Sequence, residues 1–170
     1  MASKAALVVA QKDFRDEEFL QTREVLQRFG VQTFVVSERL EPAHGKFGAV
    51  ALPNLTLQEL KEKDFDAIVF IGGPGARRYS DKRTVLHRAQ EFASAGKVVA
   101  AICSAPTILA NAGLLMGKRA TAFPTEEQVL KDHGAEYTGA PVESDGQIIT
   151  ARDSTYAREF AEKIAWELDL

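Results

Sequence analysis

The one cysteine of the chain, Cys103, lies in a segment whose residue types suit nucleophilic chemistry. The apolar run 98–102 precedes it and Pro106 follows shortly after, which predicts a buried strand that turns sharply into a helix. Such a turn needs small residues two positions to either side of the nucleophile, and Ala101 and Ala105 occupy those positions. Because the start of a helix favours the thiolate, we expect the pKa of Cys103 to be lowered. A buried, unreactive thiol is the alternative.

A carboxyl group in the first predicted helix, residues 16–29, is the expected partner of this thiol. Glu18 shares a helical line with Val25 and Phe29, and this mostly apolar line should face the protein interior. Glu17 lies on the solvated line instead. Burial should push Glu18 toward its neutral form, which can donate a hydrogen bond to a thiolate. A charge at the helix entry, favoured there by the helix dipole, is the alternative interpretation.

A glycine-rich turn, Gly72-Gly73-Pro74-Gly75, ends the apolar run 67–71. It matches neither the dinucleotide-binding motif nor the phosphate loop, so we expect no nucleotide cofactor. We expect the backbone N–H of Gly73 to face the cysteine. Together with the N–H of Ser104 it would form an oxyanion hole.

None of the three histidines, His44, His87 and His133, adjoins Cys103 in the sequence. A cysteine hydrolase needs a histidine within hydrogen-bonding reach, so we expect little or no general peptidase activity. One cysteine and three scattered histidines do not make a usual structural zinc site, and we expect no metal.

The elements that must position these residues alternate between strands and helices. Fully apolar strands separated by helices predict an α/β fold, with a mostly parallel sheet covered on both faces and ligands bound outside the carboxyl ends of its strands. A short excursion, residues 45–57, should form a hairpin. The strands are expected at 7–10, 31–36, 67–71, 98–102 and 147–150, and the helices at 16–29, 82–95, 104–112, 125–134 and 155–168.

Composition limits the remaining classes of function. With 170 residues, 45% hydrophobic content and a net charge of −3, the chain fits one domain, residues 1–170. It has no basic face for nucleic acid or membrane. A lone cysteine forms no intrachain disulfide, and the apolar run 5–10 is short for a signal peptide. We therefore expect a cytoplasmic protein.

Taken together, these features resemble the ThiJ/PfpI superfamily, which includes PfpI-type intracellular proteases and the Parkinsonism-associated deglycase. The resemblance covers nearly the whole chain, and its carriers are residues 13–18, 45–57, 65–73, 96–106, 112–118 and 145–152. It implies a flavodoxin-like three-layer sandwich and a homodimer. It also implies Cys103 as nucleophile, Glu18 as its carboxyl partner, and Gly73 and Ser104 as oxyanion-binding residues.

Three departures from the family pattern bear on the activity. Protease-type members follow the cysteine with histidine, where this chain has Ser104, and carry glutamate where Arg77 stands. Deglycase-type members have a histidine near the position of Phe123. The resemblance thus implies a cysteine-dependent enzyme that acts on small carbonyl or acyl substrates, as a glyoxalase, deglycase or amidase. The alternative is a non-enzymatic redox sensor that responds through oxidation of Cys103.

Overall fold

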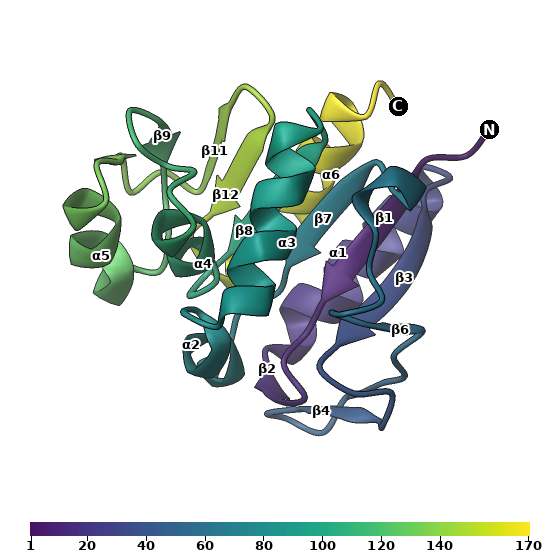
Figure 1. The fold of residues 1–170 in the computed structure, drawn as a ribbon. Coiled ribbons are helices and arrows are strands. Elements are labelled where there is room, and N and C mark those ends of the chain that lie inside the picture. The colour runs from purple at the N-terminus through teal and green to yellow at the C-terminus, as the bar shows by residue number, and fades with distance from the viewer.

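The apolar runs of the sequence form the central strands of a seven-stranded sheet in the computed structural model, which describes residues 1–170 (Figure 1). The strands are β1 (Lys4–Val8), β3 (Gln32–Ser37), β6 (Leu55–Thr56), β7 (Ala67–Phe70), β8 (Val98–Ile102), β11 (Val142–Asp145) and β12 (Ile148–Ala151). Their order across the sheet is β11-β12-β8-β7-β1-β3-β6. Every neighbouring pair is parallel except β11 with β12.

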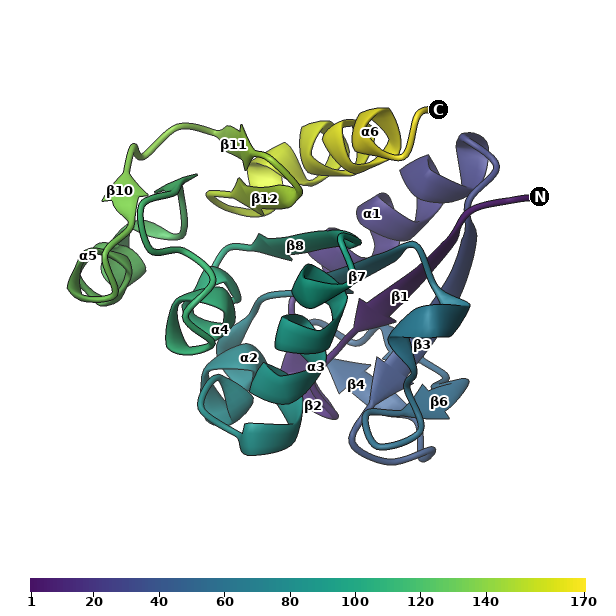
Figure 2. The ribbon, with the colours of Figure 1, turned by 45° about the horizontal axis from the view of Figure 1, so that its top comes forward.

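Helices cover both faces of this sheet, as Figure 2 shows. The helices are α1 (Asp16–Arg28), α2 (Pro74–Tyr79), α3 (Arg83–Ser94), α4 (Pro106–Asn111), α5 (Glu127–Asp132) and α6 (Ala157–Glu167). On one face α1 and α6 pack on the strands, with Phe19 and Phe160 in the buried cluster. On the other face α2 to α5 cover the sheet around Phe92 and Ile108. The expected α/β class, a mostly parallel sheet with helices on both faces, is confirmed.

The chain changes direction across the sheet at β1. From β1 it passes to β3 on one side, and it then returns to β7 on the other side. Parallel sheets bind ligands at such a switch point, outside the carboxyl ends of the strands. The segments that leave β1, β7 and β8 at this edge contain Glu18, Gly72 and Cys103, so the topology brings the predicted site residues to one place.

Smaller elements complete the fold. The strands β2 (Lys12–Phe14), β4 (Ala43–Gly45) and β5 (Val50–Ala51) form a small second sheet. The hairpin expected at residues 45–57 spans residues 43–51 as β4 and β5, because Leu55–Thr56 joins the main sheet as β6. The strands β9 (Arg119–Ala120) and β10 (Glu136–Tyr137) pair with each other. Short 3-10 turns occur at η1 (Glu62–Asp64), η2 (Pro124–Glu126) and η3 (Ser154–Tyr156). None of the helices has both the length and the apolar character needed to cross a membrane.

Three local predictions differ from the structure. The sequence interpretation has no helix directly after the glycine turn, yet Pro74 begins α2, a position where the missing N–H of proline costs nothing. Helix α4 begins at Pro106 rather than at Ser104. The helix expected from residue 125 begins as the 3-10 turn η2, and α5 starts only at Glu127 without a side-chain cap; the Thr125 hydroxyl donates to the neighbouring Glu126 carboxylate at 3.3 Å instead.

Candidate active site

Cys103 directly follows β8 with a positive φ of 65°, an uncommon conformation for a residue other than glycine. Such a conformation costs about 1–2 kcal/mol and persists only where the surroundings hold it. Two backbone hydrogen bonds hold it here: the Cys103 N–H donates to the carbonyl of Ala151 at 2.9 Å, and its carbonyl accepts from the N–H of Phe123 at 2.8 Å. The thiol is partly exposed. The sharp turn expected from the small neighbours of Cys103 is therefore present.

Glu18 is completely buried beneath this turn. Its Oε1 accepts a hydrogen bond from the N–H of Gly72 at 2.9 Å. Its Oε2 makes no hydrogen bond in the structure, and among the side chains the Cys103 thiol has the largest effect on the pKa of this carboxyl. Burial raises the pKa of Glu18 to about 8, although the Cys103 thiol and the hydrogen bond from Gly72 oppose the rise. The inward orientation and the shift toward the neutral acid, both expected from the helical line, are confirmed.

Glycine is required at position 72, at the base of the site, because there is no space for a side chain there. A methyl group on Gly72 would lie 2.5 Å from the carbonyl oxygen of Ile102, 2.7 Å from Oε1 of Glu18 and 2.9 Å from Cβ of Cys103. Its φ lies outside the left-handed region, so the backbone conformation alone does not require glycine. The close approach of three segments does.

The expected lowering of the thiol pKa is wrong. Burial is the largest cause of a raised pKa of Cys103, and the charge of Glu18 and its hydrogen bond to the thiol raise it further. The N–H of Ser104 and the Arg77 cation oppose this rise without reversing it. Helix α4 begins only at Pro106, so Cys103 lies outside its first turn, where a helix dipole would act. The thiol and the carboxyl therefore titrate as a coupled pair.

The two expected oxyanion donors lie next to each other, but they are not equally free. The N–H of Ser104 acts on the thiol of Cys103, where it opposes the rise of the thiol pKa. The N–H of Gly73 donates to the Ser104 hydroxyl at 3.2 Å, and this hydroxyl donates to the carbonyl of Gly73 at 2.9 Å. The role of Ser104 and Gly73 as oxyanion donors thus stays a prediction.

Two arginines that the sequence analysis did not assign to the site interact with it electrostatically. Arg15 belongs to the turn that packs on Gly72: its N–H donates to the Gly72 carbonyl at 2.8 Å, and its cation interacts with both Glu18 and Cys103. The cation of Arg77, in α2, also interacts with Cys103. The proximity of Arg15 to Glu18 in the sequence was the available signal.

The three histidines lie outside the site. His44 and His87 are exposed, on β4 and α3 respectively. The ring Nδ1 of His133 lies 2.8 Å from the carbonyl of Val129 in its own helix. No histidine is hydrogen-bonded to Cys103. The structure also contains no cluster of three or more His, Cys, Asp or Glu side chains that could hold a metal ion.

Comparisons with known proteins show to which family the chain belongs. The family model of the DJ-1/PfpI family matches residues 3–167. An uncharacterized protein of Methanocaldococcus jannaschii is 38% identical over 93% of this chain and 78% of its own length. A protein of Caenorhabditis elegans named as a glutathione-independent glyoxalase is 30% identical, over 99% of this chain and 90% of its own. A protein of Pyrococcus horikoshii named as a deglycase is 30% identical, over 86% and 88% respectively.

Solved structures show the same fold. A ThiJ/PfpI domain protein from Brachyspira murdochii superposes with a TM-score of 0.97 at 28% identity, over 99% of this chain and 98% of that chain. The DJ-1beta protein of Drosophila melanogaster superposes with a TM-score of 0.90 at 32% identity, over 99% and 91%. The expected flavodoxin-like sandwich is confirmed. On the matches in sequence and in structure, the chain belongs to the DJ-1/PfpI family.

Proposed function

We propose that this protein is a cysteine-dependent enzyme that acts on small aldehydes, with Cys103 as nucleophile and Glu18 as general acid and base. The observation that carries the proposal is the buried Glu18 carboxyl beside a partly exposed thiol on a strained turn. A general acid or base is most effective when its pKa lies near the working pH, and the pKa of Glu18 is raised to about 8. Relatives named as a glyoxalase and a deglycase support the substrate class.

The first step would be addition of sulfur to the aldehyde carbon. The base is the ionised form of Glu18, whose fraction grows as the pH approaches its pKa of about 8. As the S–C bond forms and the C=O π bond opens, this carboxylate takes the thiol proton. The same proton then passes to the oxygen of the new hemithioacetal, so that atoms and charge balance. The N–H of Ser104, and that of Gly73 after release from the Ser104 hydroxyl, would stabilise the oxygen as it becomes negative.

For an α-oxoaldehyde the hemithioacetal can rearrange. Glu18 would remove the proton from the carbon bound to sulfur and return it to the neighbouring carbon. The hydroxyl proton of the hemithioacetal passes at the same time to the neighbouring carbonyl oxygen, which converts the adduct into a thioester of a hydroxy acid. Hydrolysis by one water molecule releases the acid and restores the thiol. The net reaction is addition of water to the α-oxoaldehyde, so it needs no oxidant or cofactor.

Peptides are poorer candidates for this site. Their cleavage requires protonation of a departing amine, which a histidine beside the nucleophile normally provides. Here Ser104 follows the nucleophile and all three histidines lie elsewhere. Addition to an aldehyde expels no amine, so we expect turnover of aldehydes to exceed that of peptides.

The test compares the purified protein with Cys103→Ser, Glu18→Gln and Glu17→Gln on methylglyoxal, short peptides and chromogenic amides. We expect turnover of methylglyoxal by the wild type, loss of it in Cys103→Ser and Glu18→Gln, and near-normal turnover in Glu17→Gln, whose carboxylate pairs with Arg15 at 2.7 Å at the surface. Turnover that survives Cys103→Ser, or is absent from the wild type, would overturn the proposal.

A redox-sensing function is the second candidate, because a partly exposed thiol lies beside a carboxyl that is neutral near pH 7. A neutral carboxyl can donate a hydrogen bond to an oxidised, negatively charged sulfur and so stabilise it. Mass spectrometry after peroxide treatment distinguishes this candidate: oxidation of Cys103 without aldehyde turnover would select it.

We further propose that the protein is a homodimer. Exposed apolar side chains gather near the hairpin and the adjoining helix: Phe47, Val50 and Leu52 are 63%, 51% and 67% exposed, and Leu20 in α1 is 41% exposed. Burying such side chains against a second copy would be favourable. Sedimentation equilibrium should give twice the 18.6 kDa chain mass at micromolar concentration, and a monomer would rule the dimer out.

A further inference from the structure

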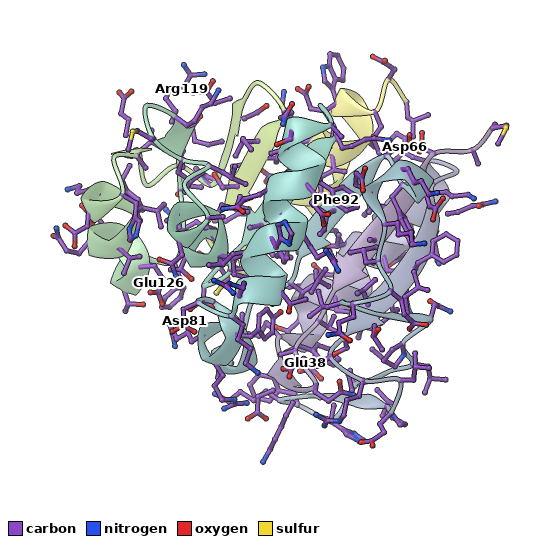
Figure 3. All side chains as sticks on the ribbon, in the orientation of Figure 1. Glu38, Asp66, Asp81, Phe92, Arg119 and Glu126 are labelled. Carbon is purple, nitrogen blue, oxygen red and sulfur yellow. The ribbon has the colours of Figure 1, made fainter.

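The two arginines that interact with Cys103, Arg15 and Arg77, are both held in place by hydrogen bonds to other residues of the chain. Arg77 donates through Nε to the Glu126 carboxylate at 2.7 Å and through Nη2 to the Thr125 hydroxyl at 3.2 Å. Glu126 is labelled in Figure 3 between α5 and α2. Glu126 is tied to the nucleophile by the chain, because its N–H donates to the carbonyl of Phe123, whose own N–H donates to Cys103.

Arg15, which directly precedes α1, is held in place by contacts of its own. Its backbone packs against Gly73, where an added Cβ would lie 2.5 Å from the Arg15 nitrogen. Its Nε donates to Glu17 at 2.7 Å, and the guanidinium lies over the ring of Phe47, 5.3 Å from the ring centre. Because both arginines engage their carboxylates through Nε, Arg15 keeps Nη1 and Nη2, and Arg77 keeps Nη1, without a partner in the chain. Their side chains are 37% and 48% exposed.

We infer that Arg15 and Arg77 select substrates that carry an anionic group beside the reactive carbonyl. Guanidinium groups with free N–H donors bind carboxylates and phosphates through charge-assisted hydrogen bonds. The carboxylate paired with each arginine partly offsets the positive charge of the guanidinium. It leaves some of the guanidinium N–H donors free to bind an anionic substrate group. This inference rests on the proposed function, since it names the class of aldehyde, but the charge preference of the thiol can be measured without any turnover.

The sharpest test compares alkylation of Cys103 by iodoacetate, an anion, with alkylation by iodoacetamide, a neutral reagent. In both reactions the sulfur displaces iodide from the same kind of carbon. Both rates depend on the same fraction of ionised Cys103, so this fraction cancels in the ratio of the iodoacetate rate to the iodoacetamide rate. The ratio therefore reports the charge around the thiol. We expect this ratio to fall about threefold in Arg15→Gln and in Arg77→Gln, the scale of one partly exposed charge pair, and about tenfold in the double variant.

Three further variants separate charge from structure. Arg77→Lys should keep most of the ratio. Glu126→Gln should raise it, because removing this carboxylate leaves the Arg77 charge uncompensated. Arg78→Gln is the matched control, since Arg78 is the next residue of the same helix but pairs with Asp13 at 3.2 Å. A ratio unchanged in both arginine variants, or lowered equally by Arg78→Gln, would overturn the inference.

Protection experiments identify the anionic group. Glyoxylate against acetaldehyde tests a carboxylate, and glyceraldehyde 3-phosphate against glyceraldehyde tests a phosphate, each as protection of Cys103 from iodoacetamide. A preference for either anion that is lost in Arg77→Gln supports the inference, and no preference in either pair contradicts it. If methylglyoxal is not turned over but the alkylation ratio responds as expected, the proposed reaction fails and the anion selectivity stands.

Discussion

In the floor of the candidate site, formed by Gly72, Glu18 and Cys103, a buried side chain meets backbone, and no added carbon atom fits at Gly72. In the rim, formed by Arg15, Arg77 and Glu126, the two arginines are partly exposed and paired with carboxylates. A charge in the floor is desolvated, so its pKa shifts strongly, whereas a charge in the rim is screened by water. The floor should therefore control reactivity and stability, and the rim should control which substrate is selected.

The largest expected effect is on the pH dependence of stability, through Glu18. Its pKa is raised from 4.5 in the unfolded chain to about 8, so between these values the folded state binds more protons than the unfolded state. The free energy of unfolding must then fall as pH rises through this window, by a few kcal/mol. Urea titrations at pH 5 and pH 8 should show this loss in the wild type and in Glu17→Gln. Glu18→Gln should largely abolish it, and a wild-type slope in Glu18→Gln would contradict the assignment.

Gly72→Ala tests the packing of the floor. The added methyl group meets backbone at Ile102 and the side chains of Glu18 and Cys103, so we expect a loss of about 2 kcal/mol in the free energy of unfolding. The alkylation rate of Cys103 should change as well, because its Cβ is one of the atoms displaced.

Gly96→Ala is the control for this substitution. Gly96 has a positive φ of 73° and open space around it, so alanine there should cost about 1 kcal/mol from backbone strain alone. It should leave the alkylation rate unchanged. Equal effects of both substitutions on Cys103 would mean that the floor is not tightly packed.

The sequence predicted the floor better than the rim for a physical reason. Helical periodicity identifies which side of α1 is buried, so Glu18 could be distinguished from Glu17. The apolar run before Cys103 and the small residues around it likewise identify the strand and its sharp turn. These are local signals. The ion pair of Arg77 with Glu126 joins residues 49 positions apart, and no local sequence pattern predicts it.

The pKa of Cys103 shows why local patterns do not suffice for electrostatics. The sequence suggested a nearby helix start, which would lower the pKa. In the structure the helix begins at Pro106, three residues after Cys103, and burial together with the Glu18 carboxylate dominates. Desolvation depends on the whole packed environment, so its balance against the helix dipole required the fold. The sharp turn at Cys103 was predicted correctly, but its effect on the pKa of the thiol was not.

The third prediction uses this correction. Since the charge of Glu18 and its hydrogen bond both raise the pKa of Cys103, Glu18→Gln should lower it. The rate of alkylation by iodoacetamide, measured against pH, should reach its midpoint at a lower pH in Glu18→Gln than in the wild type. Glu17→Gln should shift the midpoint much less, because Glu17 acts on the site only at a distance and through Arg15. A midpoint that rises in Glu18→Gln would restore the opposite view, in which a neutral carboxyl stabilises the thiolate.

The smallest expected effect on stability belongs to the rim, and it completes the contrast. Arg15→Gln removes an ion pair whose side chains are 37% and 39% exposed, and such pairs contribute about 0.5 kcal/mol or less. Arg28→Gln is a matched control, because Arg28 pairs with Glu24 on the exposed side of the same helix. Both variants should unfold within about 0.5 kcal/mol of the wild type in urea titrations. Only Arg15→Gln should change the ratio of alkylation by iodoacetate and iodoacetamide, because only its cation interacts with Cys103. A loss of stability in Arg15→Gln as large as that of Gly72→Ala would place Arg15 in the floor. The proposal that the floor controls reactivity while the rim controls substrate selection would then be wrong.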